Sequence, residues 1–219
     1  MEKKNTSLLT TIILAVVTGI YTVLVCTVNK APVGPEGTSV GFSSMNKAFA
    51  DAIGFSPLWD KITDVMMIAA ILAAVSFVVL GIMQLVKKKS VLKVDKAILA
   101  LAAVYIVVVV LYVFFDKVPI NYRPIIMPDE TSPEASFPST HTLVICTILS
   151  TAIVAWDRVF SDKKTICNIL KIAAIAVMVI GVAGRIIAGV HWITDIIAGL
   201  LFSATLTAAY VTALDIIDQ

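Results

Sequence analysis

The sequence predicts an all-α, polytopic membrane protein with six transmembrane helices. Hydrophobic residues make up 59% of the 219-residue chain, charged residues only 15%, and the mean hydropathy of +0.97 lies far outside the range of soluble proteins. Six separate windows are apolar enough to cross a membrane, for which a helix needs about 20 residues. Because lipid offers the backbone no hydrogen-bond partners, these windows must be helices.

The six windows follow one another along the whole chain, and we expect them to form one domain, residues 1–219. The longest connection, residues 29–60, is rich in Gly, Pro and Ser. An apolar pattern near Met45 to Ile53 suggests a short interfacial helix within this connection. The windows lie at residues 8–28, 62–86, 97–115, 141–156, 166–184 and 192–214.

Lysine and arginine are shared unequally between the two ends of the predicted helices. Ten of them lie in the amino-terminal segment and in the segments 87–96 and 157–164, and six lie on the opposite side. By the positive-inside rule, both termini are cytoplasmic, and residues 116–140 and 185–191 face outward from the cell membrane. The net charge of +2 includes no basic tract of the kind that binds nucleic acid, so we expect no nucleic-acid partner.

The segment 116–140 is broken by prolines and cannot continue the third helix. It contains Lys117 and Arg123, and it ends in "PSTH" at residues 138–141, directly before the fourth window. Ser139 or Thr140 is suited to cap that helix. The free N–H groups and the positive end of a helix attract phosphate, so this corner is a candidate anion site.

A second polar group lies in the stretch "GRIIAGVHWITDII", residues 184–197, within otherwise apolar sequence. His191 and Asp195 are four residues apart, so they would share one face of a helix and could form a hydrogen bond. A carboxylate in this position fixes the histidine tautomer and leaves the other ring nitrogen free to act as a nucleophile. An interfacial ion pair is the alternative, although ionisable residues near a membrane interior are functional candidates by default.

Three motifs together resemble the signatures of the type 2 phosphatidic acid phosphatase superfamily. They are Lys117 to Pro124, "PSTH" at 138–141, and the pattern R-x5-H-x3-D at 185–195. The resemblance implies a six-helix membrane enzyme with an outward-facing site. It implies hydrolysis of a lipid phosphate or diphosphate, such as an isoprenoid diphosphate, phosphatidylglycerol phosphate or phosphatidate, through a phosphohistidine intermediate and without a metal or cofactor.

Residue by residue, the resemblance implies that His191 attacks phosphorus, Asp195 orients His191, and His141 protonates the leaving oxygen. It further implies a set of groups that hold the phosphate oxygens. Such a set suits phosphoryl transfer, which depends mainly on positioning and on charge stabilisation. The set comprises Arg123, Arg185, Ser139, the backbone at Thr140, and Lys117.

The sequence departs from the family pattern at three positions. Five residues, where the family has six, separate Lys117 from Arg123, and Asp116 stands at the expected place of the lysine. Lys117 therefore has a second interpretation as an anchor at the membrane surface. Gly184 stands where the family has serine, and Thr140 stands where it has glycine.

Two alternatives stay open from the sequence. A non-hydrolytic lipid-headgroup binder or transporter could reuse the same phosphate site. The acidic residues Asp129, Glu130 and Glu134 could bind a metal, but their irregular spacing favours a solvated loop, and we expect no metal site.

Overall fold

The computed structural model describes residues 2–160 and 162–219. In this part of the chain the secondary structure is helical, apart from isolated bridges that pair Ala31 with Val40 and Tyr122 with Ala135. Six of its α-helices are long and apolar enough to cross a membrane, which confirms the predicted fold class. The helices are α1 (Glu2–Thr27), α2 (Ser43–Ile53), α3 (Pro57–Lys88), α4 (Lys96–Lys117), α5 (Thr140–Val159), α6 (Lys164–Ala188) and α7 (Ile193–Ile217).

The helices extend beyond the windows expected from hydropathy, most of all α3, which has 32 residues. It begins at Pro57, a residue that favours the first helical position because its missing N–H would have no partner there. At the start of α4 the Asp95 side chain accepts a hydrogen bond from the N–H of Ala97 at 2.8 Å. Hydropathy finds the apolar centre of each helix, whereas caps and prolines set its ends.

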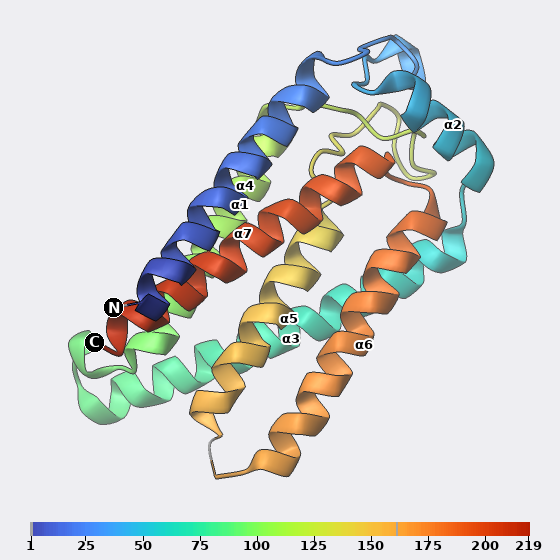
Figure 1. The fold of residues 1–219 in the computed structure, drawn as a ribbon. Helices are drawn as coiled ribbons and strands as arrows, with labels where there is room; N and C mark the ends of the chain where they lie inside the picture. Colours follow the sequence, from blue (N-terminus) through green and yellow to red (C-terminus); the bar gives the residue numbers. More distant parts are fainter. Residues whose placement is uncertain (1, 161) are drawn as a thin grey trace.

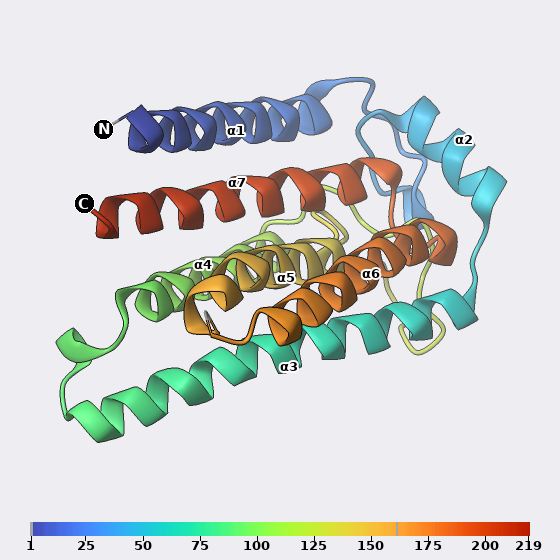
Figure 2. The same cartoon turned by 60° about the horizontal axis from the view of Figure 1, so that its bottom comes forward.

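The long helices form a bundle in which both chain termini lie at one end and α2 lies at the other (Figure 1). The most apolar window of α5 is 61% buried, against 11% for those of α1 and α3. Helix α5 is central because it contacts α3, α4, α6 and α7. Helix α1 packs along α7 at the edge of the bundle, as Figure 2 shows from a second side.

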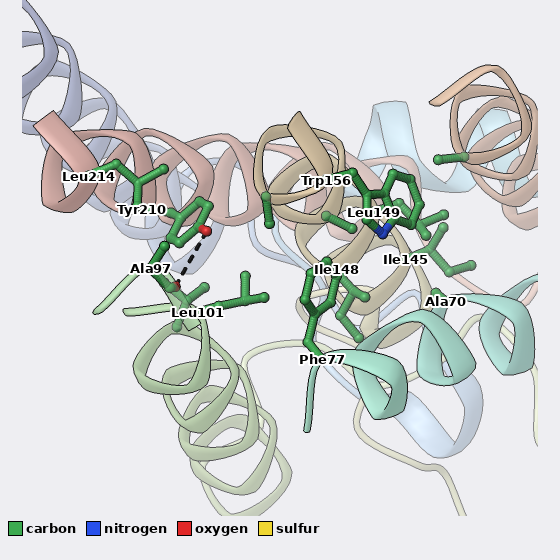
Figure 3. Close-up of a cluster of buried hydrophobic side chains, with 14 of the residues drawn as sticks. Ala70, Phe77, Ala97, Leu101, Ile145, Ile148, Leu149, Trp156, Tyr210 and Leu214 are labelled. Carbon is green, nitrogen blue, oxygen red and sulfur yellow. Dashed lines mark hydrogen bonds between the residues drawn. The ribbon is translucent and has the colours of Figure 1, made fainter. Parts of the chain in front are cut away.

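The main apolar core joins α3, α4, α5 and α7 (Figure 3). In it the rings of Phe77 and Trp156 stack with centroids 6.3 Å apart, and the hydroxyl of Tyr210 donates to the carbonyl of Ala97 at 3.4 Å. Large apolar side chains on the outside of the bundle are exposed, as expected for helices that face lipid. This core fixes the position of α3 relative to α5.

A second, smaller core attaches the loop between α4 and α5 to the bundle. The ring of Phe137 in this loop meets Phe115 edge to face at 5.6 Å, and Phe115 meets Phe202 of α7 at 5.5 Å. Edge-to-face aromatic pairs each contribute about 0.5–1.5 kcal/mol beyond the area that they bury. The loop that carries Arg123 is therefore fixed against α4 and α7.

Helix α2 lies in the segment where the apolar pattern suggests a short helix, and one buried residue ties it to α7. The Asn46 amide donates to the carbonyl of Gly41 at 2.7 Å and to the hydroxyl of Thr194 at 2.9 Å, and it accepts from the N–H of Thr194 at 3.3 Å. A buried amide with all these bonds made is a specific link. It fixes the start of α7, one residue before Asp195.

Candidate active site

Residues of all three sequence motifs meet at the end of the bundle that carries α2. Arg123, Thr140, His141 and His191 line one end of a cavity of about 570 Å³. The rest of the cavity is a groove of largely apolar side chains from α3, α4 and α5. Those residues are Met67, Ile71, Ala74, Val75, Val78, Tyr105, Val108, Val109, Tyr112, Val144 and Ile148.

Arg185, in the last turn of α6, is the largest fully buried side chain, with 0% exposure. Its Nη1 donates to Oδ1 of Asp60 at 2.5 Å and to the hydroxyl of Thr63 at 3.1 Å, both on α3. Nε and Nη2 are buried and have no protein partner. These two atoms form one edge of the guanidinium plane, the edge that suits two oxygens of a phosphate.

His191 lies in the short connection between α6 and α7 and is 5% exposed. Neither ring nitrogen has a hydrogen-bond partner in the protein. Burial, together with the positive charges of Arg185 and Arg123, lowers the pKa of His191 well below its usual value of 6.5. His191 is therefore a neutral base at neutral pH, with its lone pair free.

The expected hydrogen bond between His191 and Asp195 is absent, and this corrects the prediction. Nδ1 of His191 lies 3.9 Å from Oδ2 of Asp195, which is too far for a hydrogen bond. The reason is that α7 begins at Ile193, so His191 precedes the helix and does not share its face with Asp195. The carboxylate faces the ring at a distance that a small shift would close.

Asp195 is instead held by groups that sequence reasoning missed. The buried Asn121 donates from Nδ2 to Oδ1 of Asp195 at 2.8 Å, and the N–H of Trp192 donates to Oδ2 at 3.3 Å. Asn121 is itself held, because its Oδ1 accepts from the N–H of Gly41 at 3.4 Å. The position of Asn121 inside the first motif could have marked it as a site residue, since an amide in a buried loop requires hydrogen-bond partners.

Two further site residues are paired with carboxylates. Nε2 of His141, in the first turn of α5, lies 2.8 Å from Oδ1 of Asp64 on α3. Nε of Arg123 lies 3.0 Å from Oε2 of Glu134, and its Nη1 donates to the carbonyl of Val190 at 3.5 Å. Glu134, expected as a solvated loop residue, lies in a loop with its side chain 39% exposed and also forms an ion pair with this arginine.

The remaining predicted site residues divide into two groups. Ser139 is the N-cap residue of α5 and fully buried; its N–H donates to the carbonyl of Asp195 at 2.9 Å, and its hydroxyl accepts from Thr142 at 3.1 Å. Thr140 lines the cavity. Lys117 does not: its side chain is 77% exposed and lies 2.8 Å from the carboxylate of Asp116.

Helix α3 supplies Asp60, Thr63 and Asp64, none of which was a sequence candidate. The two aspartates are four residues apart and therefore share one face of the helix. The available signal was the pair of carboxylates at the edge of an apolar window, where charges are costly unless paired. Their partners lie on other helices, 77 and 125 positions away in the sequence.

Among the residues that the structure describes, no three His, Cys, Asp or Glu side chains stand close enough to hold a metal ion together. The groups that the site does offer are a neutral nucleophilic nitrogen, a second histidine and two guanidinium groups. These groups can bind and attack a phosphorus centre. Metal independence stays a prediction.

Comparisons with known proteins show the fold and the family of the chain. A crystal structure titled as the first transmembrane PAP2-type phosphatidylglycerolphosphate phosphatase from Bacillus subtilis matches with a TM-score of 0.64 at 16% identity, covering 95% of this chain and 96% of that one. No curated protein matches. The model of the PAP2 superfamily matches residues 96–216, which is more than half of the sequence, and the chain therefore belongs to the PAP2 superfamily.

Proposed function

We propose that this protein is a lipid phosphate phosphatase that hydrolyses the phosphate or diphosphate of a membrane lipid through a phosphohistidine intermediate. The carrying observation is the buried Nε and Nη2 edge of Arg185, which has no partner in the protein. Buried donors are normally hydrogen-bonded, and two phosphate oxygens match this edge in charge and geometry.

Substrate binding follows from the shape of the cavity. Arg185 and Arg123 hold the phosphate oxygens, and the N–H groups at the start of α5, near Thr140, add donors at the positive end of the helix. The apolar groove between α3 and α4 leads away from the two histidines. A lipid chain in this groove would place its phosphate against the arginines.

In the first step, Nε2 of His191 attacks phosphorus, because Nδ1 is the nitrogen that faces Asp195. A P–N bond forms and the P–O bond to the lipid breaks, while His141 gives its proton to the leaving oxygen. Asp195, held by Asn121, stabilises the positive charge that develops on the ring of His191. In the second step, water attacks phosphorus, its proton passes to His141, and orthophosphate and free His191 are released.

The two histidines give this mechanism a direct test. The purified protein in detergent should release orthophosphate from phosphatidate, phosphatidylglycerol phosphate or an isoprenoid diphosphate and form an acid-labile phosphoenzyme. His191→Ala should abolish both, whereas His141→Ala should slow phosphoenzyme formation. A wild-type protein that binds these lipids and never releases phosphate would support the headgroup binder or transporter instead. A phosphoenzyme that persists in His191→Ala would reverse the assignment.

We further propose that the site faces outward from the cell membrane, with both termini in the cytoplasm. The support is the excess of Lys and Arg at the end that carries the termini and the turns after α3 and α5 (Figure 1). A cysteine at Ser132 should react with a membrane-impermeant thiol reagent in intact cells, and one at Ser90 should be protected. The reverse pattern would place the site in the cytoplasm.

A further inference from the structure

The face of α3 that borders the site changes from acidic to apolar within one turn. Asp60 and Asp64 lie at its start, and Met67 and Ile71 follow at helical spacing, so they continue the same stripe. The carboxylates contact Arg185 and His141, while Met67 and Ile71 line the groove. A substrate that leaves the site along this stripe passes Asp64 and then meets only apolar side chains.

Asp64 lies beside His141, the residue that we propose protonates the leaving oxygen. Its Oδ1 is 2.8 Å from Nε2 of His141. The side chain of Asp64 is 55% exposed, so the rest of the carboxylate is accessible. With Nε2 held by the carboxylate, Nδ1 is the nitrogen of His141 that remains for the leaving oxygen. The carboxylate also stabilises the doubly protonated ring, which is the form that can give a proton while Nε2–H stays bonded to Asp64.

The positive charge beside the cavity is sufficient for one phosphate group only. Among the described residues that line it, Arg123 alone carries a permanent charge, and Glu134 forms an ion pair with it. Arg185 is likewise paired with Asp60. Lys117 is directed away, in contact with Asp116. A second phosphate, placed between the first phosphate and the lipid chain, would face Asp64 and the apolar stripe without a cation of its own.

We propose that the site selects lipid phosphate monoesters over diphosphates and that Asp64 is the residue that determines this choice. This inference rests on the proposed phosphatase function and narrows its substrate class. The two leaving groups differ in chemistry. A monoester releases an alkoxide that must take the proton of His141 to become an alcohol, whereas a diphosphate releases a phosphate monoester, which is a stable anion and needs no proton.

Asp64 therefore acts in opposite directions on the two substrates. For a monoester, it positions His141 and favours the protonated ring that gives its proton as the P–O bond breaks. For a diphosphate, its negative charge repels the departing phosphate. A repulsion between two unit charges about 4 Å apart near a protein surface changes a rate by about tenfold or more. Asp64 is a positioning and specificity residue, since it acts through His141 and through its field.

The experiment compares dodecyl phosphate with dodecyl diphosphate, which share one tail, and with p-nitrophenyl phosphate, whose leaving group needs no proton. Orthophosphate release is measured with the full-length protein in detergent. We expect the wild type to prefer the dodecyl monoester by at least about tenfold in kcat/KM. Asp64→Asn should lower kcat for that monoester by at least about tenfold with little change in KM, and should leave the aryl phosphate rate nearly unchanged.

Two further variants serve as controls for the loss of the Asp64 carboxylate. Asp64→Glu retains the carboxylate and should restore part of the monoester rate. Asp51→Asn removes a carboxylate that is paired with Lys47 on the surface of α2, and it should change none of the three rates.

The outcomes separate this inference from the function on which it rests. A wild type that prefers the diphosphate, or an Asp64→Asn protein that loses all three activities equally, would overturn the assignment of Asp64 while the phosphatase stands. No phosphate release by the wild type from any of the three substrates would overturn the phosphatase itself. Preference for the monoester that shrinks at least about tenfold in Asp64→Asn would support the inference.

Discussion

Gly184 is packed so closely against α3 that the serine usual at this family position should destabilise this protein. A Cβ atom at Gly184 would lie 2.6 Å from Cγ2 of Thr63 and 3.2 Å from the ring of Trp59. Carbon atoms in contact are normally about 3.5–4.0 Å apart. Gly184→Ser therefore requires α3 or the Thr63 side chain to move.

Thr63 cannot move without losing hydrogen bonds, because its hydroxyl acts both as a donor and as an acceptor. The hydroxyl donates to the carbonyl of Asp60 at 2.7 Å and accepts from Nη1 of Arg185 at 3.1 Å. A rotation that removes Cγ2 from Gly184 would break both bonds. Overpacking of this kind costs about 1–3 kcal/mol. At about 2–4 °C per kcal/mol for a chain of this size, the expected fall in Tm is about 2–12 °C.

The assay is thermal unfolding of the purified protein in detergent, together with orthophosphate release. Thr63→Ser removes Cγ2 and keeps the hydroxyl, so the double variant Thr63→Ser/Gly184→Ser should recover most of the lost Tm. Gly19→Ala is the matched control, because a Cβ on this exposed glycine of α1 would meet nothing within 4 Å. Its Tm should stay the same or rise slightly.

Three results would refute this reasoning. The first is a Gly184→Ser protein whose Tm stays within about 1 °C of the parent with full activity, since the close contact with Thr63 would then carry no cost. The second is an equal loss in the double variant, which would remove Thr63 from the explanation. The third is a comparable loss in Gly19→Ala, which would indicate a general effect of replacing glycine.

Four further predictions follow from the site. Asn121→Ala leaves Oδ1 of Asp195 buried without its donor, so we expect a loss of about 1–3 kcal/mol in thermal unfolding together with a lower kcat. Arg185→Lys keeps the charge but removes the two-atom edge, and kcat/KM for phosphate release should fall at least about 100-fold. The pKa of His191 is lowered in the folded state, so below about pH 6.5 the unfolded chain binds a proton that the folded protein does not. The Tm of the wild type should therefore fall as the pH drops below that value. The fall should be smaller in His191→Gln, which lacks this histidine. EDTA should leave phosphate release intact, and a full loss that Mg²⁺ restores would indicate metal-assisted hydrolysis instead.

The fold was predictable because each of its main features has a local cause. Six apolar windows of sufficient length require six helices, and this inference needs no knowledge of how the helices pack. The sequence alone also singled out His141, His191 and Arg185 as candidates, since each lies within a short contiguous motif, and their roles stay predictions. The family match over residues 96–216 covers all three.

The partners of these residues were not predictable, because they depend on packing between distant helices. Asp60 and Asp64 precede their partners in the sequence by 125 and 77 positions. The rule for residues four apart was wrong for His191 and Asp195 because it holds only inside a helix, and α7 begins between them. Spacing alone left Lys117 with two interpretations, and only the structure shows that it lies in contact with Asp116.

Under the proposed function, the pairing of both arginines with carboxylates would explain how a buried site binds phosphate and still releases it. A buried guanidinium without a counter-charge costs several kcal/mol, so Asp60 and Glu134 stabilise Arg185 and Arg123 before a substrate arrives. The same carboxylates weaken the attraction for a phosphate in its ground state. Only an interaction that strengthens in the transition state raises the rate of the chemical step. In the proposed reaction, the Nε and Nη2 edge of Arg185, held in place from its opposite side by α3, would meet the phosphoryl group as its charge spreads. Asp60 and Glu134 would weaken the hold of the two arginines on the product orthophosphate, so that it can leave.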